Sequence, residues 1–268
     1  MICKNCGRES DENYCPACGQ KMGIGRLNFR SMIHNVILGV FNSDKGIFFT
    51  IKELYTRPGY MIRDYLEGKR VRYFAPFQML FVLAAVYVVL YGLLGLVQFD
   101  EKKFYRADIN EYMGQGIAWV VNWMQKYIAF VWLLMVPLSG CLFRWICGKR
   151  FRHTYNWAET FFIVAYIQAQ QAVISVISLF FFYFYRRITF ARGGQIAAFD
   201  VIRAGEGVQY ILVLITVLLS AWTFRQLNGG SWFRNIGNML IVNLLFYLFV
   251  VIFWFIFFTV AIMQHLGF

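Results

Sequence analysis

Long apolar stretches without a single charged residue dominate this sequence. Five of them follow one another along the chain, at 73–99, 127–143, 160–185, 207–224 and 235–268, and an apolar approach from residue 117 lengthens the second. Uncharged runs of this length match a hydrocarbon layer about 30 Å thick, whereas soluble helices are shorter and amphipathic. The pattern predicts a mainly α, polytopic membrane protein with about five transmembrane helices.

The residues before the first apolar run follow two other patterns. Residues 1–22 are polar and rich in cysteine, and they contain no apolar segment typical of a secretory signal. Residues 23–75 carry apolar side chains at helical spacing, and Pro58 and Gly68 fit a helix start and a helix stop. We therefore expect three regions: a metal-binding ribbon at 1–22, amphipathic interfacial helices at 23–75 and a transmembrane bundle at 76–268.

The charge distribution predicts an orientation. The chain has a formal net charge of +12, and its basic residues lie beside the apolar runs, which favours lipid headgroups and topology over nucleic acid. In a five-span arrangement, eighteen Lys and Arg lie on the side of the amino terminus and eight lie on the other. The positive-inside rule then places the amino terminus in the cytoplasm. Residues 186–206 oppose this arrangement, because their four arginines would lie outside.

The first 22 residues contain two Cys-x2-Cys pairs, each followed by glycine: Cys3, Cys6, Cys15 and Cys18. This spacing lets a tight turn direct two sulfurs at one ion, and four thiolates suit a structural Zn²⁺ with no open coordination position. Two disulfides would need an oxidising compartment, and a rubredoxin-type iron centre would need a longer interval between the pairs. Cys141 and Cys147 are expected to be ordinary packing residues.

The segment before the first apolar run is rich in Arg, Lys and Tyr. One interpretation is an anchor that sets topology. The other is a site for lipid headgroups or a protein partner, since Arg binds phosphate bidentately and Tyr suits the wet boundary of a bilayer. The candidate residues for such a site are Arg57, Arg63, Tyr65, Lys69, Arg70, Arg72 and, from a later helix, Glu159.

Two segments carry a family resemblance. TIKELYTRPGYMIRDYLEGKRVRYFAPFQML, preceded by CxxCG and YCPACGQ, resembles an uncharacterised family of multi-pass inner-membrane proteins common in Bacteroidetes. The likeness is best in the first hundred residues, with a weaker echo in YNWAETFFIVAY at 155–166. The resemblance implies the zinc ribbon, the pre-membrane motif and a bacterial inner membrane, but no activity. The family pattern has histidines where this chain has Thr160 and Tyr166.

Polar residues inside an apolar helix indicate buried contacts. At 100° per residue, Glu159, Tyr166 and Gln170 fall on one line of a helix, while Gln168 and Gln171 point elsewhere, so we expect protein on more than one side of it. Glu159 is expected to pair with Arg152 or Arg144. We also expect Asn243 to bond to another helix and the aromatic residues 180–185 to face lipid.

No catalytic constellation is recognisable. The three histidines, His34, His153 and His265, lie in different regions, and the sequence has no HExxH motif, nucleophile elbow or phosphate loop. His153 near Glu159 fits a headgroup contact better than an acid and base pair.

We therefore expect a non-enzymatic scaffold or transport-accessory protein whose ribbon docks a protein partner. The alternative is a lipid-handling enzyme or flippase that acts on a phosphorylated lipid. A self-assembling channel fits less well, because the apolar runs offer few charges to line a pore. Membrane lipids are the other expected partners, and homo-oligomers are possible.

Overall fold

The structure is a computed structural model that describes residues 1–29, 46–94, 135–191 and 198–265. Apart from the two isolated β-bridges of the first 22 residues, its regular elements are helices. They are α2 (Ile47–Thr56), α3 (Pro58–Glu67), α4 (Pro76–Leu93), an apolar helix at Met135–Ile146, α7 (Gly148–Thr154), α8 (Trp157–Ala191), α9 (Ala198–Asn228) and α10 (Trp232–His265).

Four of these helices are long and apolar enough to cross a membrane. Their apolar segments are Pro76–Leu93, Trp157–Tyr185, Tyr210–Asn228 and Trp232–Phe257, and they correspond to the first, third, fourth and fifth predicted spans. The predicted second span, 127–143, lies partly outside the described residues. Its described part, 135–143, belongs to the helix Met135–Ile146.

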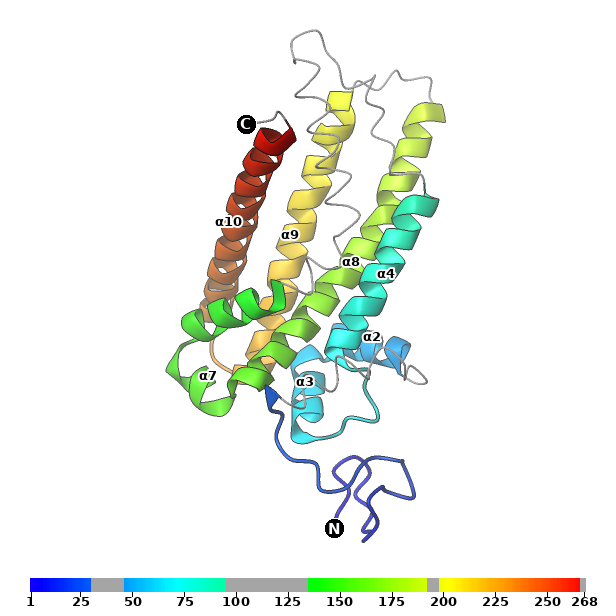
Figure 1. The fold of residues 1–268 in the computed structure, drawn as a ribbon, viewed down its shortest axis with the longest axis vertical. Coiled ribbons are helices and arrows are strands. Elements are labelled where there is room, and N and C mark those ends of the chain that lie inside the picture. Colours follow the sequence, from blue (N-terminus) through cyan, green and yellow to red (C-terminus); the bar gives the residue numbers. More distant parts are fainter. Residues whose placement is uncertain (30–45, 95–134, 192–197, 266–268) are drawn as a thin grey trace.

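The long helices have one end in common, which we call the ribbon end of the bundle (Figure 1). The ribbon, α2, α3, α7 and the turn between α9 and α10 all lie at this end, and the chain ends at the other. Helix α4 packs along α8, while α9 packs against both α10 and α3. The segments that charge counting assigned to the amino-terminal side are therefore close together in space where the structure describes them.

The predicted helix signals before α4 are confirmed. Helix α3 has Pro58 at its first position and ends at Gly68, whose φ of 115° is a left-handed conformation that favours glycine. Along its length α3 buries Met61, Ile62 and Tyr65. These side chains contact protein: Tyr65 lies edge-on to Tyr166 of α8, with ring centroids 5.4 Å apart.

Helices α3 and α9 approach each other closely at Gly59. A Cβ atom at this position would lie 2.6 Å from the carbonyl oxygen of Thr223 and 3.0 Å from the backbone nitrogen of Leu227, and it would also overlap Gln226 Cβ. Only a residue without a side chain fits here. The backbone N–H of Gly59 donates a hydrogen bond of 2.8 Å to Gln226 Oε1, which fixes the register of the two helices.

Candidate metal centre and its attachment to the helices

Each Cys-x2-Cys pair lies in a turn with the same backbone hydrogen bonds. The Cys3 N–H donates to the Arg8 carbonyl at 2.9 Å, and the equivalent Cys15 N–H donates to the Gln20 carbonyl at 2.8 Å. Gly7 and Gly19 close the two turns with φ of 78° and 71°, values that strain any residue with a side chain. The sequence repeat is therefore also a structural repeat.

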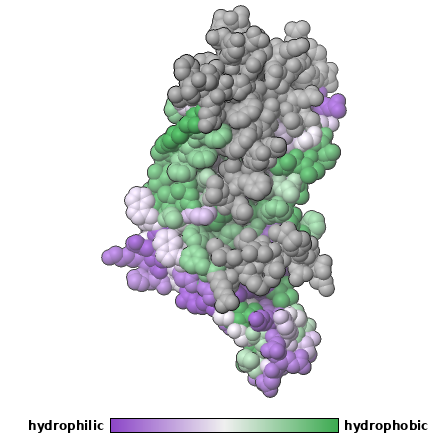
Figure 2. Space-filling model, viewed as in Figure 1, coloured by the Kyte–Doolittle hydropathy of each residue, from purple (hydrophilic) through white to green (hydrophobic). Residues whose placement is uncertain are grey.

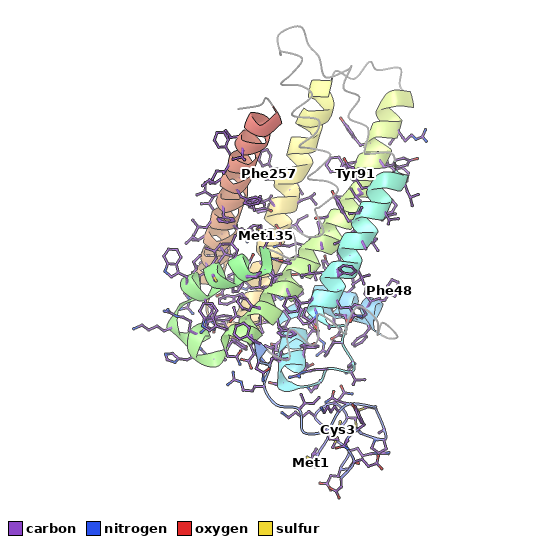
Figure 3. The ribbon with its side chains drawn as sticks, in the orientation of Figure 1. Met1, Cys3, Phe48, Tyr91, Met135 and Phe257 are labelled. Atoms are coloured by element: carbon purple, nitrogen blue, oxygen red, sulfur yellow. The ribbon has the colours of Figure 1, made fainter. Side chains whose placement is uncertain are left out.

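The two turns bring the four cysteine sulfurs together; Figure 3 labels one of these residues, Cys3, in the ribbon. All four Sγ atoms lie within 4.8 Å of one another, with Cys3 and Cys18 at 3.6 Å and Cys6 and Cys15 at 3.4 Å. A tetrahedral ion with metal–sulfur bonds of about 2.3 Å would separate its ligands by about 3.8 Å. The cluster could therefore hold a metal ion.

Backbone amides favour the thiolate form at two of these positions. The N–H of Cys6 is the main cause that lowers the pKa of Cys3, against the opposing effect of burial. At Cys15, burial acts to raise the pKa, but the N–H groups of Ala17 and Cys18 outweigh it and lower the pKa to about 7. Thiolates are the form that binds metal.

The other two cysteines lie far along the chain, on the apolar helix and at its end. Cys147 is buried in the main core, as expected of a packing residue, but Cys141 is exposed. Neither belongs to the metal-ligand cluster of the described residues.

A short segment, residues 23–28, attaches the ribbon to the first turn of α8, and we call it the strap. Arg26 makes a bidentate ion pair with Glu159: the distance from Nε to Oε1 is 2.9 Å and that from Nη2 to Oε2 is 2.6 Å. Asn156 donates through Nδ2 to the Leu27 carbonyl at 3.0 Å. The Glu159 side chain is 4% exposed, so this charged contact is buried on one side.

Glu159 also caps its own helix. The Asn156 N–H donates to Glu159 Oε2 at 2.9 Å, and the Glu159 N–H donates to Asn156 Oδ1 at 2.8 Å. This reciprocal arrangement is a capping box, and a carboxylate there also interacts favourably with the helix dipole. The Glu159 carboxylate therefore accepts a backbone N–H at the start of α8 and also binds Arg26 of the strap.

The expected partners of Glu159 were wrong. Neither Arg152 nor Arg144 pairs with it, because Arg26, remote in sequence, occupies the carboxylate. Arg144 instead donates to the Tyr155 carbonyl at 2.7 Å and to Thr160 Oγ1 at 3.1 Å, and its guanidinium lies over the Trp157 ring at 4.5 Å.

A second contact joins the ribbon to the segment after α3. Gln20 is 2% exposed, and its Oε1 accepts the backbone N–H of Arg70 at 3.1 Å. Arg70 in turn donates through Nη2 to the Gly25 carbonyl at 3.0 Å. The ribbon is thus attached at two places, by the strap to α8 and by Gln20 to the chain that enters α4.

The candidate headgroup residues on α2 and α3 have partners inside the protein. Arg57 pairs with Glu53 and lies 3.7 Å from Asp64, while Lys69 lies 2.6 Å from the other oxygen of Asp64. Tyr73 donates to Asp64 at 3.1 Å. The donors from Lys69 and Tyr73 outweigh burial and lower the pKa of Asp64.

Arg63 and Tyr65 are also used internally, whereas Arg72 is exposed. Arg63 donates to the carbonyls of Gln226 and Leu227 at 2.7 and 2.9 Å, so it caps the last turn of α9 with a favourable positive charge. Tyr65 is buried against α8. Arg72 lies over the Phe49 ring at 4.8 Å. The candidate set therefore does not form one surface.

The polar line on α8 faces protein, as expected. Tyr166, fully buried, donates to the Phe74 carbonyl at 2.8 Å, and Gln170 donates to the Leu54 carbonyl at 2.7 Å. Gln168 points elsewhere and donates to Ser139 at 2.8 Å. Asn243 differs from expectation, because its Nδ2 donates to Met239 of its own helix.

The remaining polar residues offer no catalytic arrangement among the described residues. His153 is exposed, while Glu159 is buried and bonded to Arg26 and Asn156. His34 lies outside the described residues. Three side chains of the aromatic end of α8, Phe180, Phe181 and Phe184, are exposed.

Sequence reasoning missed three residues of the attachment: Gln20, Arg26 and Asn156. The spacing of Asn156 and Glu159 is a capping-box signature and could have identified Asn156. No local pattern could have identified Arg26 or Gln20, because their partners lie 133 and 50 residues away.

Comparison with known proteins gives one match. Residues 44–88 match the model of a protein family of unknown function, DUF3667. No curated protein and no solved structure matches the chain. The matched segment contains α2, α3 and most of α4, so in this segment the chain is similar to an uncharacterised family, and the likeness does not extend to the cysteine cluster.

Proposed function

We propose that this protein is a bacterial inner-membrane scaffold, or an accessory of a transport system, that uses a cytosolic zinc ribbon to dock a protein partner. Zn²⁺ is the expected ion because four thiolates in tetrahedral proximity suit it, and metal binding can fold a segment too small for a core. The reducing cytosol would keep the cysteines available.

The observation that carries this proposal is the double attachment of the ribbon. A linker alone would let the ribbon move freely, but the ion pair of Arg26 with the buried Glu159 and the contact of Gln20 with Arg70 hold it against the helices. A ribbon held in one orientation presents one surface. Such pre-organisation lowers the cost of binding a partner.

Exposed apolar side chains on the ribbon support docking. Met1, Ile2 and Tyr14 are 63%, 66% and 59% exposed, although the ribbon is otherwise polar. Apolar and aromatic side chains on a small polar domain are typical of protein contacts. By contrast, Arg57, Arg63, Lys69 and Glu159, which a lipid-handling site would need, have intramolecular partners. This favours the scaffold over a lipid-handling enzyme.

Elemental analysis of the purified full-length protein tests the metal. We expect one zinc per chain in the wild type and none in Cys15→Ser, because a missing thiolate opens the site. Cys141→Ser is the matched control and should retain the zinc, since Cys141 is exposed and lies outside the cluster. Iron in place of zinc, or no metal, would contradict the proposal.

Site-specific photo-crosslinking in living cells tests docking. A photoreactive amino acid at Tyr14 should give one discrete protein adduct, and this adduct should disappear in Cys15→Ser. The same probe at Val251, exposed on α10, should not give that adduct. If the adduct persists without the metal, or if Tyr14 gives none, the ribbon is not the docking surface.

A further inference from the structure

Helix α7 is anchored by one aromatic side chain. Phe151 is fully buried and packs on three rings, with centroid distances of 6.0 Å to Phe143, 5.0 Å to Tyr155 and 5.6 Å to Phe224. With this side fixed against the bundle, the rest of the helix faces outward. Apart from Thr154, its exposed side chains are basic or titratable: Lys149, Arg150, Arg152 and His153.

These charges have no acidic partner in the described part of the chain. No ion pair there involves Lys149, Arg150 or Arg152. The nearest carboxylate in sequence, Glu159, is buried and bonded to Arg26. Helix α7 therefore differs from α3, where Arg57 and Lys69 flank the helix and share the carboxylate of Asp64.

Tryptophans beside α7 indicate its depth. Trp145 precedes the helix and is 72% exposed, and Trp157 follows it and is 46% exposed. Trp232, also exposed, begins α10 at the same end of the bundle, where Arg225 lies over its ring at 4.5 Å. Exposed Trp at the ends of long apolar helices is typical of the bilayer interface.

The space-filling view agrees with this placement (Figure 2). A hydrophilic edge projects from the molecule at the position that α7 occupies in Figure 1, next to the hydrophobic surface of the long helices. Tryptophans at a bilayer interface flank lipid phosphates, so a basic helix between Trp145 and Trp157 is suited to the depth of those phosphates. A surface that binds only a soluble protein would not require these exposed indoles.

We propose that α7 is a binding surface for the headgroups of anionic phospholipids in the leaflet at the ribbon end of the bundle. The phosphates accept hydrogen bonds from Arg150 and Arg152, and Lys149 adds a point charge. Trp145 and Trp157 contact the glycerol and upper acyl region. This surface is separate from the docking of a protein on the ribbon, and neither depends on the other.

Native mass spectrometry of the full-length protein released from nanodiscs tests this surface. The discs contain phosphatidylcholine with one tenth phosphatidylglycerol. Each basic residue near an anionic surface adds about fivefold to lipid affinity. Among the lipids bound to the wild type, the ratio of phosphatidylglycerol to phosphatidylcholine should therefore exceed the ratio in the disc by at least about tenfold. The triple variant Lys149→Gln, Arg150→Gln, Arg152→Gln should show the bulk ratio.

Two further variants make the test specific. The matched control Arg8→Gln, Lys21→Gln, Lys52→Gln removes three exposed charges away from α7 and should keep the wild-type enrichment. The swap Lys149→Arg, Arg150→Lys, Arg152→Lys keeps the charge and should keep most of it. If the triple Gln variant does not insert, the single change Arg150→Gln is measured instead and should lower the enrichment by about fivefold.

Four outcomes would overturn the proposal. These are no enrichment in the wild type, unchanged enrichment after the Gln substitutions on α7, an equal loss in the control, and a complete loss in the charge-conserving swap. No enrichment in the wild type would mean that the exposed charges of α7 bind an acidic protein instead of lipid. An equal loss in the control would show that the enrichment depends only on net charge.

Discussion

Helices α8 and α10 are both long and apolar, but their surroundings are opposite. In an 18-residue stretch of the apolar segment of α8, 61% of the residues are buried inside the protein, whereas in such a stretch of α10 only 6% are, although α10 is the more apolar of the two. Hydrophobicity and burial in the protein therefore run in opposite directions here, which is the reverse of the rule for soluble proteins.

The difference follows from the polar and small residues. Helix α8 carries Glu159, Tyr166 and Gln170, each hydrogen-bonded to a segment that precedes α4. Its alanines 158, 165, 169 and 172 are all buried and allow close packing. In a bilayer an apolar side chain gains little by leaving lipid, so helix packing follows polar bonds and small residues. Helix α10 offers few of either.

The largest expected effect comes from breaking the strap contact on α8. Arg26→Ala leaves the Glu159 carboxylate buried without its counter-ion. Because Arg26 itself is 67% exposed, we expect a loss at the low end for a buried ion pair, about 2 to 3 kcal/mol in the free energy of unfolding. Unfolding in mixed dodecyl sulfate micelles measures it.

Arg8→Ala is the matched control for the strap, since Arg8 is an exposed arginine without an ion pair in the described residues. Its unfolding free energy should stay within about 0.5 kcal/mol of the wild type. Equal losses in the two variants would mean that the strap contact has no special role.

A methyl group at the contact of α3 and α9 comes next. Gly59→Ala places a Cβ against the backbone of α9, so the helices must separate, at a cost of about 2 kcal/mol. The control is Gly237→Ala on α10, where no atom lies within 4 Å and a small gain in helix propensity is expected. Thermal unfolding followed by Trp fluorescence measures both, and a tolerated Gly59→Ala would contradict the close approach.

A smaller loss should follow from removing one hydroxyl on α8. Tyr166→Phe leaves the Phe74 carbonyl without its buried donor and should cost about 1 kcal/mol. On α10, Thr259→Ala removes an exposed hydroxyl that bonds only to Phe255 of the same helix, and we expect little change. If the two losses in unfolding free energy were the same, polar bonds would not explain why α8 is buried.

The smallest effect is a pH dependence at Asp64 on α3, whose carboxylate bonds to residues outside α8. The folded-state pKa of Asp64 is lowered, so its contribution is present above the unfolded value of about 4 and is lost as the pH falls through the folded value. Its partners Arg57 and Lys69 are partly exposed, so the contribution is at most about 1 kcal/mol. Asp64→Asn should flatten the stability curve below pH 5.

Asp11→Asn is the control for this pH dependence, because Asp11 is fully exposed and pairs only with the terminal amine in the described residues. Its curve of unfolding free energy against pH should follow the wild type. A flattened curve in this variant alone would place the pH dependence in the ribbon.

Much of the fold could be predicted from local patterns. Four long apolar helices, the start and stop of α3 at Pro58 and Gly68, and the gathering of four cysteines each depend on residues close in sequence. Such features depend on local backbone preferences and hydropathy, and a short stretch of sequence is enough to predict both. The direction of the polar line on α8 followed from helical periodicity in the same way.

The partners of that polar line could not be predicted. Several basic residues could reach the depth of Glu159, and the sequence does not say which one arrives there. Arg152 and Arg144 are closer to Glu159 in sequence, yet Arg26 forms the ion pair. Likewise Arg57, Arg63 and Lys69 look like headgroup ligands in the sequence, and only their neighbours in space reveal internal partners.

The sequence by itself determined what each segment is: a pair of cysteine turns, amphipathic helices and apolar helices long enough for a bilayer. Only the tertiary structure decided which charges have partners inside the protein and which, as on α7, form no ion pair within the described residues. The physical reason is that a charge is neutralised by whatever lies within a few ångströms, and the folded chain, through contacts such as that of Arg26 with Glu159, sets those distances.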